Sequence, residues 1–362
     1  MKRKRKAVTV AVCVILVLGI ITLIVFPPSK GEVSAYKDAN GNTPDGSFAE
    51  KVFVDVDGFQ IGAILLGQNK ENPVLMICGG GPGIPQYLVE YLYPSVLSEY
   101  FTVCYWDYRG TGLSFDSAID PEEMTTERYI TDALAVTDYL CERFGQEKIY
   151  IMGHSFGTYL ALETVSQYPD KFIAYIAMSQ VCNQKQSEYL AYDYMRDRYV
   201  QADNSKMVKR FDECPIRESD EMYEKYFSSS LRDKAMHELG VGTTRDMKSV
   251  ISGLFFPSLR CTSYTQRERI NLWRGKANSK EFEVTKESIN FNAFNDIKTI
   301  DIPIYFIVGK YDCTCMASLQ EEYYEVIGAP KKELYLFENS AHSPLYEEPE
   351  RARQVLEEIL NH

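Results

Sequence analysis

Residues 148–179 read KIYIMGHSFGTYLALETVSQYPDKFIAYIAMS, and this stretch decides the fold. Its first six residues form a short apolar run, as expected for a strand that is buried on both faces. Residues 158–168 have the features of a helix, and residues 171–179 form a second apolar run. A strand, a helix and another strand in this order predict two parallel strands joined by a crossover helix.

A serine between glycines lies where the first strand meets the helix, in Gly153-His154-Ser155-Phe156-Gly157. The backbone of such a turn bends so sharply that flanking side chains would clash, which glycine avoids. The turn raises the serine hydroxyl above the sheet edge, where the helix N-terminus favours a developing negative charge. The context predicts that Ser155 is a nucleophile supported by Gly153 and Gly157; an ordinary Gly-Ser turn is the alternative. His154 is adjacent to the serine and cannot fold back onto it as a base.

A serine nucleophile needs a base, and the base needs a carboxylate that orients it. Of the four histidines, His342 lies in a loop directly after the apolar run 333–338, where α/β sheets place reactive groups. Asp312 follows the apolar run 302–309 in the same way. The chain order serine, aspartate, histidine fits a nucleophile of this kind. The alternatives are a surface histidine, a turn-forming aspartate, and Glu338 as the carboxylate.

A run of glycines, residues 79–83, directly follows another apolar strand-like run. Acyl transfer needs two backbone N–H groups that stabilise the tetrahedral oxyanion. One comes from the residue after the nucleophile, Phe156, and the other from a loop of this type. We expect Gly81 to be the second donor, with Gly80 and Pro82 shaping the loop; a plain glycine turn is the alternative.

The alternation of strands and helices extends over residues 51–180 and resumes over residues 296–362. Between them, residues 181–295 are rich in tyrosine and charge and contain helix-like segments without a clear apolar strand. The pattern predicts an α/β fold: a mostly parallel sheet with helices on both faces and an inserted helical cap.

The N-terminus predicts a membrane anchor. Residues 1–6 include five consecutive cations, and residues 7–26 follow without a charge, long enough to span a bilayer as a helix. The positive-inside rule places the cations in the cytoplasm and the catalytic domain outside, as in a single-pass protein of the cell membrane. Residues 27–50 are expected to be a loose linker. Cleavage near residues 33–35 is the alternative, which would make the protein secreted.

The charge argues against a nucleic-acid partner, because the chain carries −12, and −17 once the five N-terminal cations are set aside. The two cysteines of residues 313–315 are too close together for a usual zinc pair, and no second pair accompanies them. We expect no metal and no organic cofactor. Disulfide pairing and oligomeric state remain open.

Three motifs in this order resemble the proline iminopeptidase branch of the α/β hydrolases: the Gly-Gly-Pro-Gly loop, Asp107–Ser114 (DYRGTGLS), and the Gly-x-Ser-x-Gly turn. The resemblance covers the core on both sides of the cap. It implies that Asp107, Arg109 and Gly112 stabilise the loop beside the site; a charged pair that braces that loop is the plain physical interpretation.

The resemblance also implies a serine hydrolase that removes the N-terminal residue of short peptides. Two departures leave the substrate open: Gly79 replaces the histidine that opens the family's glycine loop, and the cap lacks the Trp- and Glu-containing pattern that holds a free amine. A carboxylesterase or lactonase is the alternative with the same triad, Ser155, Asp312 and His342. A non-catalytic extracellular binding module is the alternative from another class.

Overall fold

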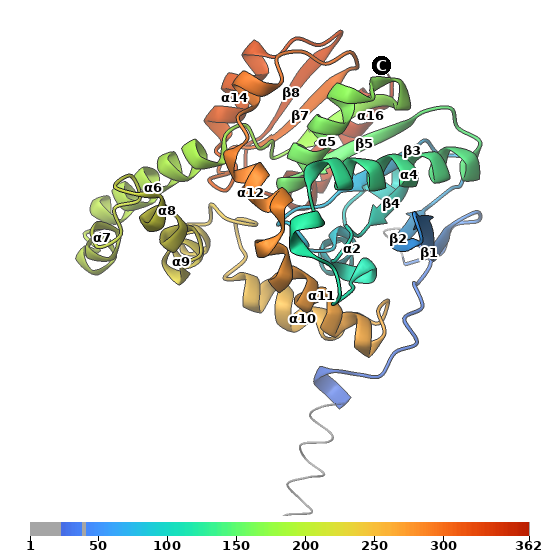
Figure 1. The fold of residues 1–362 in the computed structure, drawn as a ribbon, viewed down its shortest axis with the longest axis horizontal. Coiled ribbons are helices and arrows are strands. Elements are labelled where there is room, and N and C mark those ends of the chain that lie inside the picture. Colours follow the sequence, from blue (N-terminus) through green and yellow to red (C-terminus); the bar gives the residue numbers. More distant parts are fainter. Residues whose placement is uncertain (1–22, 38–40, 362) are drawn as a thin grey trace, which may run out of the picture.

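The computed structural model describes residues 23–37 and 41–361, and its centre is an eight-stranded sheet (Figure 1). The strand order is β1-β2-β4-β3-β5-β6-β7-β8. β1 pairs antiparallel with β2, β2 pairs antiparallel with β4, and the other neighbours are parallel. The predicted α/β fold with a mostly parallel sheet is confirmed. The strands are β1 (Phe48–Val56), β2 (Phe59–Gly67), β3 (Val74–Cys78), β4 (Thr102–Trp106), β5 (Ile149–His154), β6 (Phe172–Met178), β7 (Ile304–Gly309) and β8 (Lys332–Phe337).

Helices cover both faces of the sheet. Successive residues of a strand point to opposite faces, so a strand that is apolar throughout needs a covering layer on each side. On β3, Met76 and Cys78 belong to one apolar core, whereas Leu75 and Ile77 belong to the other. The first core is closed by α4 (Thr126–Phe144), α5 (Phe156–Gln167) and α14 (Ala317–Val326). The second is closed by α2 (Gln86–Leu92), α3 (Leu97–Tyr100) and α16 (Pro349–Leu360).

The first hairpin turns at Asp57 and Gly58. Both residues have positive φ, 55° and 80°, as the two central positions of a type I′ turn require. Glycine adopts this conformation without strain, and aspartate is among the residues that tolerate it. β1 begins at Phe48, slightly before the expected start of the core at residue 51.

The chain between β6 and β7 is built from helices and is called the cap segment below. Its first four helices share a separate apolar core and project to one side of the sheet, while α11 and α12 lie across the core (Figure 1). The helices are α6 (Gln184–Gln201), α7 (Ser205–Asp212), α8 (Asp220–Phe227), α9 (Ser230–Glu238), the π-helix η4 (Ile251–Phe255), α10 (Phe256–Ser258), α11 (Gln266–Asn278), η5 (Ser279–Glu281), α12 (Glu283–Asn290) and α13 (Ala293–Asp296). Short helical turns in the core loops are η1 (Gly112–Ser114), η2 (Pro121–Glu123), η3 (Pro169–Lys171) and α15 (Pro344–Glu347).

The expected membrane anchor, residues 7–26, lies outside the described residues except for its last four. Along the part of the chain that the structure describes, no helix is both long and apolar enough to cross a membrane. The expectation of a loose linker is wrong for its first residues. The Ser29 hydroxyl donates to the carbonyl of Thr262, and the Arg269 guanidinium donates to the carbonyl of Pro27. This part of the linker therefore lies along the domain.

Candidate active site

The predicted site residues come together at one edge of the sheet. β4, β3, β5, β6, β7 and β8 are parallel neighbours in this order, and their carboxyl ends meet at that edge. The loop after β3 carries residues 79–83, and Ser155 follows β5. Asp312 follows β7 and His342 follows β8. Reactive groups of α/β sheets lie in this position, so the topology can join residues that are far apart in the sequence.

Ser155 is held in a strained turn between β5 and α5. Its φ of 56° and ψ of −126° are unusual for a residue with a side chain, which is a frequent feature of functional sites. The flanking glycines make the turn possible. A Cβ built on Gly157 would lie 1.9 Å from the carbonyl oxygen of Cys78, and one on Gly153 would lie 2.7 Å from the nitrogen of Thr158. Both glycines therefore have the supporting position that the sequence predicts.

His342 and Asp312 form a hydrogen-bonded pair. The imidazole Nδ1 lies 2.9 and 3.0 Å from the two carboxylate oxygens of Asp312, and both side chains are buried. The N–H groups of Thr314 and Cys315 donate to Oδ1 of the same carboxylate, and the Gln320 amide donates to Oδ2. These bonds fix the carboxylate, and the carboxylate assigns the imidazole proton to Nδ1. Nε2 is left without that proton, as a general base requires.

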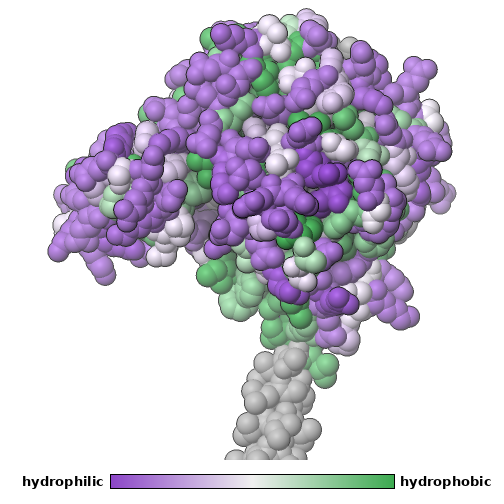
Figure 2. All heavy atoms as spheres, in the orientation of Figure 1, coloured by the Kyte–Doolittle hydropathy of each residue, from purple (hydrophilic) through white to green (hydrophobic). Residues whose placement is uncertain are grey.

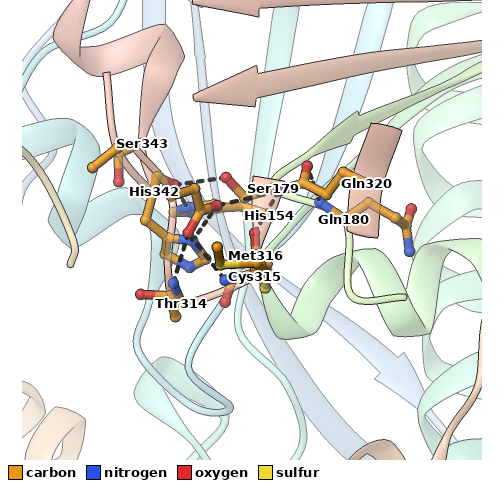
Figure 3. A network of polar contacts seen from close by, with 12 residues as sticks. His154, Ser179, Gln180, Thr314, Cys315, Met316, Gln320, His342 and Ser343 are labelled. Atoms are coloured by element: carbon orange, nitrogen blue, oxygen red, sulfur yellow. Dashed lines mark hydrogen bonds and ion pairs between the residues drawn. The ribbon is translucent and has the colours of Figure 1, made fainter. Parts of the chain in front are cut away.

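His154 has a role that the sequence did not reveal. Its Nε2 lies 2.9 Å from the backbone carbonyl oxygen of His342, and the Ser179 hydroxyl donates to the same oxygen (Figure 3). Burial, with the nearby His342 as a second cause, lowers the pKa of His154 to about 3. The ring is therefore neutral, and the accepting carbonyl assigns its proton to Nε2. His154 positions the loop of His342 through the backbone, which only the folded chain can show.

The glycine loop passes close to the nucleophile. A Cβ built on Gly80 would lie 3.1 Å from the Cβ of Ser155, so the bare backbone is needed there. Gly81 has a φ of 83°, in the region that favours glycine. The other expected donor, the N–H of Phe156, belongs to the first residue of α5 and has no partner within that helix. The loop and the helix start therefore both border the serine.

The cap segment holds the carbonyl side of the glycine loop. The Lys276 ammonium of α11 donates to the carbonyls of Gly81 and Pro82, and the Ser279 hydroxyl donates to the carbonyl of Pro82 at 2.7 Å. Burial lowers the pKa of Lys276 to about 8. These bonds attach the glycine loop to the cap segment on its carbonyl side.

Asp107 and Arg109 bond to different partners. Arg109 forms a bidentate pair with Asp132 of α4, at 2.6 and 2.9 Å. Asp107 accepts the N–H of Leu113 at 2.7 Å, and burial raises its pKa to about 7. A Cβ built on Gly112 would lie 2.1 Å from an oxygen of Asp107, so this position needs glycine. Both charged residues do stabilise the loop, but through separate partners.

The rival carboxylate is turned away from the histidine. Glu338 is exposed and forms an ion pair with Lys310 at 2.6 Å. Among the described residues, no cluster of His, Cys, Asp and Glu could hold a metal ion. The eight cysteines from Cys78 to Cys315 are free thiols, and all but Cys141 are buried.

Comparison with known proteins gives the family. Residues 73–349 match the family described as alpha/beta hydrolase fold. The chain is 35% identical to the probable aminopeptidase YbaC of Bacillus subtilis (strain 168), over 82% of this chain and 91% of that protein. It is 24% identical to the proline iminopeptidase of Heyndrickxia coagulans, over 85% of this chain and 98% of that protein.

A solved structure agrees at the level of the fold. The proline iminopeptidase of Mycobacterium smegmatis superposes with a TM-score of 0.63 at 16% sequence identity, and the match covers 86% of this chain and 98% of that chain. At this identity the likeness concerns the fold alone.

Proposed function

This chain belongs to the alpha/beta hydrolase fold family and resembles its proline iminopeptidase branch, and on that premise we propose that it is a serine hydrolase. The proposed reaction removes the N-terminal residue of a short peptide through an acyl-enzyme. The names of the relatives, a probable aminopeptidase and a proline iminopeptidase, support a peptide substrate over an ester.

The proposed reaction begins with attack of the Ser155 hydroxyl on the carbonyl carbon of the scissile bond. Nε2 of His342 takes the hydroxyl proton and then delivers it to the departing amine. Asp312 stabilises the imidazolium that forms between these two steps. The N–H groups of Phe156 and Gly81 stabilise the oxyanion. Water, deprotonated by the same histidine, then attacks the acyl-enzyme and releases the acid, and the proton returns to the serine.

One observation carries this proposal: the buried hydrogen bond between His342 Nδ1 and Asp312. A histidine without a catalytic role does not require a buried carboxylate that three further donors already fix. A general base does require it, because the pairing fixes the tautomer of the imidazole and stabilises the imidazolium that forms. The strained backbone of Ser155 at the same sheet edge supports the assignment of the nucleophile.

Covalent labelling of the purified protein tests the nucleophile. A fluorophosphonate probe should label the wild-type chain and leave Ser155→Ala unlabelled, with Ser166→Ala as the control that still labels. Ser166 lies on the same helix α5, where its hydroxyl bonds only to the carbonyl of Glu163. Equal labelling of wild type and Ser155→Ala would remove Ser155 from the reaction.

The substrate class is tested separately with fluorogenic amides and esters. An aminopeptidase should cleave aminoacyl amides with a free N-terminus and lose that activity when the amine is acetylated. An enzyme that prefers simple acyl esters and ignores the amine is an esterase, and the peptide assignment is then wrong.

We also propose that residues 7–26 anchor the chain in the cell membrane with the catalytic domain outside. The uncharged length of this segment behind five cations supports the proposal. The protein should stay with the membrane fraction through a high-salt wash and leave it only with detergent. Release by salt alone contradicts a spanning anchor.

A further inference from the structure

Large apolar side chains are exposed on the face of the cap segment that η4, α10 and α11 form. Ile251 of η4, Phe256 of α10 and Ile270 of α11 are exposed to 60%, 57% and 52%. α10 packs against η4, and the ring of Phe255 contacts the ring of Trp273 on α11 at 5.0 Å. Since burial of each such side chain contributes roughly 1.5–3 kcal/mol, leaving three in water is costly and indicates a covered surface.

The described chain begins at the same face. Leu23 and Ile24 are each exposed to 59%, and they precede Phe26, whose ring lies under the guanidinium of Arg269 on α11. The Gln266 amide also donates to the carbonyl of Phe26. Figure 2 shows hydrophobic residues gathered at the end of the molecule where the described chain begins, below α10 and α11 in Figure 1. Residues 23–26, the described end of the uncharged segment, therefore lie beside α11.

The charge of this face is opposite to that of the whole chain. Residues 245–280 contain eight Lys and Arg against two Asp and Glu, in a chain whose net charge is −12. On α11, Arg267, Ile270 and Arg274 are spaced by three and four residues, so the two cations flank the exposed isoleucine on one helix face. Lys248 and Arg260, both exposed, flank the apolar positions of η4 and α10 in the sequence.

From these observations we infer that the face formed by η4, α10 and α11 docks onto an anionic lipid surface, with Ile251, Phe256 and Ile270 inserted at the interface. An apolar strip bordered by cations is the pattern of an interfacial membrane surface, where the apolar side chains enter by roughly 5–10 Å. Cations near anionic lipid add attraction that neutral lipid does not offer. The inference rests in part on the proposed anchor, which would hold this face toward the bilayer.

Docking would also fix how the catalytic site faces the membrane. α11 carries Ile270 on the docking face and Lys276, which holds the glycine loop, less than two turns further along. The catalytic edge would therefore be kept at a short and constant height above the lipid. A substrate displayed at the membrane surface would suit such an arrangement.

The test places a fluorescent reporter in the docking face of the full-length chain. Phe256→Trp, reconstituted in phosphatidylglycerol vesicles whose acyl chains carry bromine, should lose fluorescence by bromine quenching and shift its emission to the blue. Val326→Trp is the matched control, because Val326 is 62% exposed on α14, away from α10 and α11 (Figure 1). The two native tryptophans supply the background, which the wild-type chain measures.

Each outcome decides the inference. Quenching of Phe256→Trp well beyond that of Val326→Trp supports docking, and Ile270→Trp should repeat it if one substitution disturbs the fold. Equal quenching at both positions overturns it. A blue shift without quenching that grows with protein density indicates contact between copies of the chain and also overturns it.

Two further measurements separate docking from anchoring and identify the lipid charge. Quenching should be weaker in brominated phosphatidylcholine, and Arg267→Gln should weaken docking to phosphatidylglycerol roughly fivefold. Equal quenching in both lipids overturns the anionic assignment. If the chain resists a salt wash but Phe256→Trp is not quenched, the anchor is real and the docking inference fails. If salt releases the chain, the anchor proposal fails, while quenching at low salt still supports docking.

Discussion

The core and the cap segment each bury one bidentate Arg–carboxylate pair, and the two pairs have different tasks. In the core, Arg109 binds Asp132 of α4, donates to the carbonyl of Val56 and lies 4.2 Å above the ring of Phe59. It therefore ties the loop after β4 to a helix and to the first hairpin. In the cap, Arg232 of α9 binds Glu188 of α6, with Nε and Oε2 2.7 Å apart.

The cap pair lies next to the loop of the catalytic aspartate. From the same α6, the Gln184 amide and the Ser187 hydroxyl donate to the carbonyl of Thr314, and the N–H of Met316 donates to Ser187. The core pair therefore stabilises the loop after β4, beside the site. The cap pair stabilises α6, which contacts the loop that carries Asp312. The comparison teaches that the cap, which supplies none of the three proposed catalytic side chains, still helps to position two loops.

The largest expected effect is at Asp312, where the two regions meet. Asp312→Asn keeps the shape of the side chain but cannot stabilise the imidazolium, and the turnover number should fall by about 10⁴. Steady-state kinetics with the best fluorogenic amide measures this. Glu338→Gln is the matched control, since its carboxylate pairs with Lys310 at the surface, and its turnover should stay near that of wild type. Comparable losses in both variants would mean that the orienting carboxylate is misassigned.

The next effect compares the two ion pairs directly. Arg109→Met and Arg232→Met each leave a fully buried carboxylate without its partner, which typically costs about 3–5 kcal/mol. For Arg109→Met we expect a lower free energy of unfolding of the whole domain in urea. For Arg232→Met we expect faster amide hydrogen exchange in α6 and α9, with exchange in β3 and β5 unchanged.

Arg196→Met is the control for both variants. Arg196 and Asp212 form an ion pair that is partly exposed, and such pairs contribute about 0–1 kcal/mol. If Arg232→Met instead unfolds the cap and the core together, the two regions form one cooperative unit, and the distinction between the two pairs is lost.

Much of the fold follows from the sequence, because the strands of the parallel sheet are short and apolar and lie between clear helices. The run 148–153 corresponds to β5, and the helix expected at 158–168 corresponds to α5. The hairpin turn follows from Asp57 and Gly58, because tolerance of a positive φ is a property of these two residues themselves. Such features depend on neighbours in the chain, which the sequence displays directly.

Contacts between distant residues were not predictable in this way. The ion-pair partner of Arg109 is Asp132, which lies 23 positions further along the chain, in α4. The hydrogen bond from His154 to the carbonyl of His342 joins residues 188 positions apart and involves a backbone atom, which no side-chain pattern reports. The cap helices resist prediction further, because several are short: α7, α8 and α12 have eight residues each.

A smaller expected effect is the change of folding stability with pH, which tests the buried environment of His154. His154 has a folded-state pKa of about 3, below the value of 6.5 for an exposed histidine. Between pH 6.5 and pH 3 the unfolded chain binds a proton that the folded chain does not, so stability falls as the pH falls through this window. At pH 5 the loss from this one group should be about 2 kcal/mol.

Urea unfolding at pH 7 and pH 5 measures that loss, and His154→Gln should remove it. The glutamine amide can still donate to the carbonyl of His342 but does not titrate. Other groups contribute equally to both chains, so the difference between them isolates the histidine. An equal pH dependence in wild type and variant would mean that His154 takes up its proton in the folded state.

The smallest expected effect is that of a substitution at Ser279. It tests whether the cap segment positions the glycine loop. Ser279→Ala removes one neutral hydrogen bond to the carbonyl of Pro82, worth about 1 kcal/mol. If that bond positions the oxyanion donor at Gly81, the loss is felt in the transition state. The turnover number should then fall about fivefold, since 1 kcal/mol corresponds to that factor, while KM stays nearly constant.

Ser288→Ala is the matched control for that measurement. Ser288 is a buried serine of α12 whose hydroxyl donates to the carbonyl of Thr285, within the cap itself. Its removal should lower the stability of the cap by a similar amount and leave the turnover number unchanged. A loss of turnover in both variants would mean that general loosening of the cap, rather than its bond to the glycine loop, slows the reaction. A loss in Ser279→Ala alone makes the cap a positioning device for the oxyanion site.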